Sequence, residues 1–165
     1  MSSNSSMRPS REIVNRADGS RLSAWAENNT SPGSEVITTR ASSFDSNQVT
    51  RWNLERQDGG TWLVRNAKDP AVCLQLASAA AVDVKVVLQK VTGDLDQRWE
   101  FVPEHTDLDA VVGDTGWWTL RPATNRNLAV TQVTLATGGW SHLALYRATD
   151  SADRLWHHQE PGADW

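Results

Sequence analysis

The sequence is poor in several features that would define a site or a partner. Its single cysteine, Cys73, cannot form an internal disulfide, so the fold must be held by packing alone. The 165 residues carry 16 Lys+Arg and 20 Asp+Glu, a net charge of −4. This lacks the basic surplus that phosphate binding needs, so we expect no nucleic-acid partner. No apolar run approaches the roughly 20 residues that span a bilayer, so we expect no membrane partner.

Motifs for catalysis and metal binding are also missing. The chain has no Cys-x-x-Cys, His-Glu-x-x-His or EF-hand pattern, no phosphate-binding glycine loop and no nucleophile elbow. His157 and His158 are adjacent, so in a strand they point to opposite faces and cannot chelate one ion together. We therefore expect no metal, no cofactor and no catalytic residue.

The ends of the chain differ from its middle. Residues 1–10 are rich in Ser and Asn and have no apolar segment of the secretory type, so we expect a disordered leader and a cytoplasmic protein. Residues 11–160 have the length of a single domain, and 161–165 form a short tail.

Tryptophan is the residue in excess. The chain has nine Trp but only one Tyr and two Phe, and a core does not need Trp in that proportion. Some of these side chains are therefore expected to serve an internal repeat, and the others are candidates for ligand contacts.

A threefold repeat is visible along the chain. Trp52, Trp99 and Trp156 each end a unit of about 45 residues that contains about four short apolar segments separated by turn residues. Earlier landmarks recur in the same order: Val14, Val64 and Leu120, followed by Leu22, Leu74 and Leu128. The units span about 11–59, 60–102 and 117–160, with an insertion at 103–116. Three units that each lack a sufficient core can close into a barrel.

The ends of the units carry a family signature. Gln97-Arg98-Trp99 is a Gln-x-Trp motif, and Thr50 and Arg154 replace the Gln in the other two copies. This pattern resembles the ricin B-type lectin-like β-trefoil family. The resemblance implies an all-β fold, a β-trefoil of three four-stranded repeats with pseudo-threefold symmetry, in which Trp52, Trp99 and Trp156 belong to the core.

Two further tryptophans are equivalent between repeats. Trp62 and Trp118 each lie two residues before the first landmark of a unit, and Glu12 has this place in unit one. We expect them to pack in the core or at the barrel end.

The resemblance also implies where a sugar would bind. Family lectins place an Asp shortly after the Leu of the second segment and an aromatic ring that stacks on the sugar, with amide side chains nearby. The residues after the three Leu landmarks are Ser23, Gln75 and Ala129, none of them Asp. The aromatic position falls on Gln89 in unit two and on Tyr146 in unit three.

The candidate ligand-binding residues follow from these positions and from the Trp residues without repeat partners. In unit three they are Trp140, His142, Tyr146 and Asp150. In unit two they are Gln75, Gln89 and Asp94, and in unit one Trp25.

Three functions are compatible with the sequence. The leading hypothesis is a carbohydrate-binding, lectin-like module without catalysis, whose partner is a carbohydrate or another small molecule. The second is an intracellular small-molecule-binding protein or enzyme with a Trp-lined pocket. The third is a protein-interaction or inhibitor module that presents the insertion at 103–116. The oligomeric state stays open.

Overall fold

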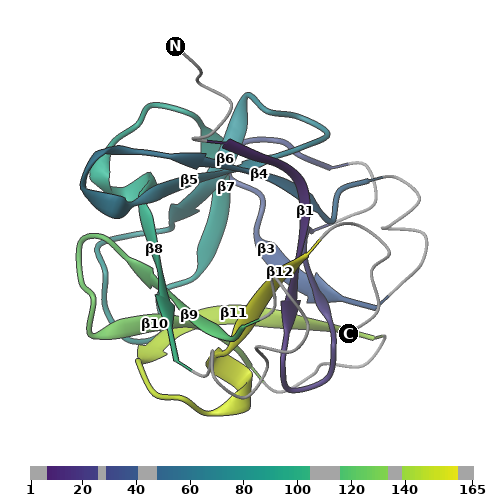
Figure 1. Ribbon diagram of the computed structural model, residues 1–165. Coiled ribbons are helices and arrows are strands. Elements are labelled where there is room, and N and C mark those ends of the chain that lie inside the picture. Colours follow the sequence, from purple (N-terminus) through teal and green to yellow (C-terminus); the bar gives the residue numbers. More distant parts are fainter. Residues whose placement is uncertain (1–6, 26–28, 41–47, 105–115, 134–138, 160–165) are drawn as a thin grey trace.

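The computed structural model describes residues 7–25, 29–40, 48–104, 116–133 and 139–159, which form a 12-stranded sheet (Figure 1). Its strands are β1 (Met7–Asn15), β2 (Arg21–Ala24), β3 (Val36–Thr39), β4 (Arg51–Arg56), β5 (Trp62–Asn66), β6 (Val72–Leu76), β7 (Val86–Lys90), β8 (Trp99–Pro103), β9 (Trp118–Pro122), β10 (Leu128–Gln132), β11 (Trp140–Arg147) and β12 (Trp156–Gln159). Three short 3-10 helices in these ranges are η2 (Asp58–Gly60), η3 (Leu95–Gln97) and η5 (Ala152–Arg154). No helix of the described ranges is long and apolar enough to cross a membrane.

Half of the strands close into a barrel. β1 pairs with β4, β4 with β5, β5 with β8, β8 with β9, β9 with β12, and β12 returns to β1. The closure pairs both edges of every barrel strand, which removes exposed sheet edges. β12 lies beside β1 in Figure 1, so the last described strand completes the ring that the first one opens.

The other strands form three hairpins, β2–β3, β6–β7 and β10–β11. They are joined to one another: β3 pairs with β11, Glu35 bridges to Val87, and the amide of Leu145 donates to the carbonyl of Val84. Each repeat thus contributes four successive strands, two to the barrel and two to a hairpin. This is the all-β trefoil with pseudo-threefold symmetry that the family resemblance implied.

The strand register corrects the alignment of unit one. The repeat tryptophans pair with Asn15, Asn66 and Pro122. The counterpart of Val64 and Leu120 is therefore Ile13, and the prediction of Val14 was wrong by one residue. Ile13 and Val14 are both buried, so the hydrophobic pattern of this strand cannot show which of them is the counterpart of Val64 and Leu120.

The same shift changes the partner of Trp62 and Trp118. Trp62 pairs with Trp99, Trp118 with Trp156, and Arg11 with Trp52. Arg11, and not Glu12, therefore has their place in unit one.

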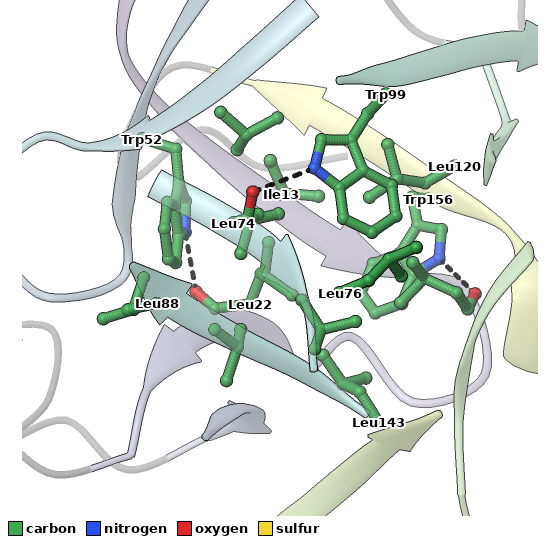
Figure 2. Close-up of a cluster of buried hydrophobic side chains, with 14 of the residues drawn as sticks. Ile13, Leu22, Trp52, Leu74, Leu76, Leu88, Trp99, Leu120, Leu143 and Trp156 are labelled. Carbon is green, nitrogen blue, oxygen red and sulfur yellow. Dashed lines mark hydrogen bonds between the residues drawn. The ribbon is translucent and has the colours of Figure 1, made fainter. Parts of the chain in front are cut away.

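The three repeat tryptophans tie the hairpins to the barrel. All three side chains are fully buried, which confirms their place in the core. Their indole N–H groups donate to the carbonyls of Leu22 at 3.0 Å, Leu74 at 3.2 Å and Val130 at 2.9 Å (Figure 2). The counterpart of Leu22 and Leu74 is therefore Val130, and the prediction of Leu128 was wrong. Leu128 and Val130 lie on the same face of one strand, so the apolar pattern fits either.

Residues expected outside the domain take part in the fold. β1 begins at Met7, so residues 7–10, expected in the leader, are strand residues. Positions 1–6, 105–115 and 160–165 lie outside the described residues, and with them most of the insertion and the tail.

The indole hydrogen bonds give a first prediction. Trp99→Phe removes the donor to the Leu74 carbonyl and leaves a void, so we expect a loss of about 2–3 kcal/mol in the free energy of unfolding. Trp25→Phe changes a side chain that is 40% exposed and should cost less than about 0.5 kcal/mol. Urea unfolding followed by circular dichroism measures both, and equal losses would contradict the role of the indole bond.

The single thiol gives a second prediction. Cys73 is fully buried, and this burial raises its pKa to about 12. Because the thiolate is the reactive form, we expect no labelling of the native protein by a disulfide reagent at pH 8 and one label per chain in urea. Rapid labelling of the folded protein would show that this part of unit two opens readily.

Candidate functional site

A pocket of about 450 Å³ opens on the third repeat, where unit three meets the first turn of unit one. It is lined by Ala17, Asp18, Thr131, Gln132, Val133, Tyr146, Asp153 and Arg154. The strands β10 and β11 form one side of the pocket, η5 forms another, and the turn after β1 supplies Ala17 and Asp18. The pocket combines one aromatic ring with carboxylate, hydroxyl and amide groups.

Tyr146, a candidate from the sequence, supplies the aromatic ring of this pocket. It pairs across the hairpin with Ala129 and is partly exposed. Its hydroxyl bonds to Asp83 of the second repeat, and this bond, with the charge of the carboxylate, raises the pKa of the tyrosine. The guanidinium of Arg154 lies 5.8 Å from the ring centroid. The ring is therefore held in place by groups from two repeats.

Arg154 occupies the position of the missing motif glutamine. Its Nε donates to the carbonyl of Arg147 at 2.8 Å, and in unit two Gln97 Nε2 donates to the equivalent carbonyl of Lys90 at 2.7 Å. The arginine therefore keeps the structural bond of the motif. Its longer side chain also carries a positive charge over the ring of Tyr146, which glutamine cannot do.

The carboxylates of the pocket were missed by sequence reasoning. The corrected register places Thr131, and not Ala129, at the position where family lectins carry Asp. The carboxylates come instead from Asp153 in η5 and from Asp18 in the turn after β1. Asp18 looked like an ordinary turn residue beside Gly19, and no local signal placed it in a pocket of the third repeat.

Asp18 is held as an anion. Its partial burial acts to raise the pKa. Hydrogen bonds from Ser20, whose amide donates at 3.0 Å, and from Gln132 outweigh that effect and hold the pKa of Asp18 below its ordinary value. The charge of Arg40 acts in the same direction. The pocket therefore presents an oriented acceptor, as hydroxyl recognition requires.

The second repeat has the equivalent pocket without the ring. A cavity of about 490 Å³ is lined by Gln75, Leu76, Ala77, Ser78, Ala79, Ala80, Asp96, Thr124 and Asn125. Gln75, Asp96 and Asn125 correspond to Thr131, Asp153 and Asp18 of the third repeat. Gln75 Oε1 accepts from Gln97 Nε2 at 2.9 Å. Of the three residues predicted here, Gln75 lines the pocket, whereas Gln89 and the exposed Asp94 do not.

Three other predicted residues form a separate cluster. The rings of Trp25 and Trp140 lie 4.8 Å apart edge to face, and His142 lies 4.8 Å from Trp140. His142 Nδ1 contacts Glu35 Oε2 at 2.5 Å, and Lys85 Nζ lies 3.7 Å from the other oxygen of Glu35. This aromatic cluster joins unit one and unit three on the surface, with Trp25 as its most exposed ring.

The unit-three candidates do not form one site. Trp140 and Tyr146 lie on the same face of β11 but six residues apart, which in a strand is roughly 20 Å. Asp150 lies in the exposed segment after β11 and does not line the pocket of the third repeat. Tyr146 and the aromatic cluster are therefore two distinct surfaces.

Trp117 and Trp165 are the other two tryptophans without an equivalent in another repeat. Trp117 is buried, with its ring 5.6 Å from that of His157 and the guanidinium of Arg16 5.3 Å from its centroid. It is a packing residue. Trp165 lies outside the described residues. Within the described ranges, no group of three or more His, Cys, Asp or Glu is placed to hold a metal ion.

Comparison with solved structures identifies the fold. No family model matches the sequence, and no curated protein sequence does. ThreeFoil, a designed 3-fold symmetric protein, superposes with a TM-score of 0.74 at 18% identity over 91% of this chain and 97% of its own. The C-half of an earthworm R-type lectin in complex with GalNAc gives 0.59 at 14% identity, over 92% and 98%. The chain therefore has a ricin B-like β-trefoil fold.

An enzyme contains a similar domain. An exo-β-1,3-galactanase from Clostridium thermocellum superposes with a TM-score of 0.72 at 14% identity, over 90% of this chain. The match covers 30% of the galactanase, so the trefoil is one part of that protein.

The lowered pKa of Asp18 predicts a pH-dependent contribution to folding. A pKa that is lower in the folded state stabilises the fold above the unfolded pKa, near 4, and this contribution is lost as pH falls through the folded value. The difference in unfolding free energy between wild type and Asp18→Asn should therefore be present at pH 7 and shrink below about pH 4. Urea unfolding across this range measures it, and a difference that is constant from pH 7 to pH 3 would contradict the prediction.

Proposed function

We propose that the protein is a carbohydrate-binding, lectin-like module and that the pocket of the third repeat is its sugar site. The observation that carries the proposal is the joint placement of the Tyr146 ring with the carboxylates of Asp18 and Asp153 around one cavity. The lectin and galactanase neighbours support carbohydrate as the class of ligand, through the fold that they share with this chain.

The chemistry of the pocket fits a sugar ring. A pyranose has an apolar face that lies against an aromatic ring and hydroxyl groups at its edge that need hydrogen-bond partners. Tyr146 offers the ring, Asp18 and Asp153 offer acceptors, and the guanidinium of Arg154 offers donors. Arg154 Nη1 also bonds Asp153 Oδ1 at 2.9 Å, which orients this carboxylate at the wall of the pocket.

The three repeats differ in whether they have a pocket with an aromatic ring. Unit two has a pocket of similar volume, but its lining has no aromatic residue. In unit one the position of Tyr146 is held by Thr39, which is buried in β3. We therefore infer one principal sugar site per chain, in the third repeat.

Binding to immobilised glycans tests the proposal. Wild-type protein is applied to a glycan array, and the strongest glycan is then titrated in solution by calorimetry. Tyr146→Ala removes the stacking ring and should lower the affinity for this glycan by at least about tenfold. Asp18→Asn should lower the affinity by a similar factor.

Trp140→Ala serves as the matched control because it removes an aromatic ring from the same face of β11 outside the pocket. Its affinity should stay within about twofold of wild type. No glycan bound by the wild type, or equal affinity of wild type and Tyr146→Ala, would rule out the sugar site. Loss of binding in Trp140→Ala alone would move the site to the aromatic cluster.

A further inference from the structure

A third cavity lies at the end of the barrel opposite the hairpins, and residues of all three repeats line it. It has a volume of about 180 Å³ and is lined by Arg8, Leu54, Trp62, Phe101, Trp118 and His158. β1, β5 and β9 begin at this end, and β4, β8 and β12 finish there. The cavity is the open mouth of the barrel and shares no lining residue with the pocket of the third repeat.

Five of the six lining residues, all except Arg8, lie at threefold-equivalent positions that carry different side chains. Leu54, Phe101 and His158 are one such set, each two residues after a repeat tryptophan. In the other set Trp62 and Trp118 line the cavity, and their counterpart in unit one is Arg11, a buried residue that is not part of the lining. A symmetric trefoil would repeat one residue at each set. This mouth is aromatic where units two and three contribute and cationic where β1 closes the ring.

The aromatic side chains around the cavity contact one another edge to face or by stacking. Trp62 lies edge to face with Phe101 at 6.5 Å, and Phe101 lies edge to face with His158 at 6.0 Å. Trp118 stacks on His158 at 4.9 Å with an interplanar angle of 16°. All four side chains are partly exposed. They therefore present ring faces and edges to the cavity, and they are not sealed in the core.

His158 is held by Arg11. Arg11 Nη2 lies 3.2 Å from His158 Nδ1 and 3.3 Å from the carbonyl of His158. Because a guanidinium only donates, Nδ1 is the acceptor and the ring hydrogen is on Nε2. The guanidinium thus places a fixed positive charge behind the imidazole.

A distortion of β1 brings a second cation to the mouth. The pairing of β1 with β4 shifts between Arg8 and Arg11, which is a β-bulge. Ser10 within it has φ = 53°, a left-handed conformation that costs a serine energy, and its amide donates to Asn53 Oδ1 at 2.9 Å. Bulges at barrel rims commonly redirect a side chain next to a site. Here the bulge lies within β1, just before the residues Glu12–Asn15 that pair with β12, and Arg8 lines the cavity.

We propose that this barrel mouth binds a small planar aromatic carboxylate. Apolar cavities of about 150 Å³ accommodate benzene, so the volume of about 180 Å³ suits one aromatic ring with a short substituent. The ring lies among Trp62, Phe101 and Trp118, and its carboxylate pairs with Arg8. A cationic ligand would gain from the aromatic faces but is repelled by Arg8 and Arg11.

Nuclear magnetic resonance of the nine indole N–H groups tests the proposal. The signals of Trp62 and Trp118 are assigned with Trp62→Phe and Trp118→Phe. Benzoate should shift these two signals with a saturating titration and leave Trp25 and Trp140 unchanged. Benzamide has the same shape without the charge and should bind at least about tenfold more weakly.

Arg8→Gln isolates the charge. Arg8 is exposed near the start of β1, so its replacement should not disturb folding. We expect the affinity for benzoate to fall about tenfold in this variant and the affinity for benzamide to stay unchanged. Tyr146→Ala should bind benzoate like the wild type, which separates this site from the proposed sugar site.

Three results would overturn the proposal. The first is no saturable shift of Trp62 or Trp118 with benzoate up to about 10 mM. The second is equal binding of benzoate and benzamide that Arg8→Gln leaves unchanged. The third is preferential binding of benzyltrimethylammonium, which would identify an aromatic cage for cations.

Discussion

The fold depends on one interaction that occurs three times, the hydrogen bond from a buried tryptophan indole to a backbone carbonyl of its own repeat's hairpin. Trp52, Trp99 and Trp156 fill the interior of the barrel and at the same time satisfy carbonyls of β2, β6 and β10 (Figure 2). A buried carbonyl without a donor is costly, so neither the barrel nor the hairpins can form well without the other. With a single cysteine in the chain, this linkage takes the place of covalent cross-links.

The repeat and the family resemblance that it carries were sufficient to predict the fold but not the strand register. The spacing of the three tryptophans and of their accompanying turns defined four strands per unit. The alignment failed where two apolar residues competed for one position, at Ile13 and Val14 and again at Leu128 and Val130. Both residues of each pair are buried, so hydrophobicity cannot choose between them. The choice is made by the cross-strand partner, which is a tertiary contact.

The candidate site was only partly predictable for a related reason. Tyr146 and Gln75 were found because they lie at repeat-equivalent positions within a hairpin. Asp18 was missed because it enters the pocket of the third repeat from the turn that follows β1, far away in sequence. Trp140 and His142 were grouped with Tyr146 because they are near it in sequence. Successive residues of an extended strand are about 3.3 Å apart, so Tyr146 lies on a different surface from Trp140 and His142, which share the aromatic cluster.

The side chains that distinguish the pocket and the barrel mouth lie at positions where the three repeats carry different residues. The motif position holds Gln97 in unit two and Arg154 in unit three, and both bond the equivalent carbonyl. What looks like decay of the motif in unit three therefore preserves its structural bond and adds a charge beside Tyr146. At the barrel mouth, Arg11 takes the position that Trp62 and Trp118 have in the other two units, and its guanidinium bonds His158. None of the three tryptophans that make the indole–carbonyl bonds lines the pocket or the mouth, so substitutions at these two places can change their chemistry and leave the bonds of the core in place.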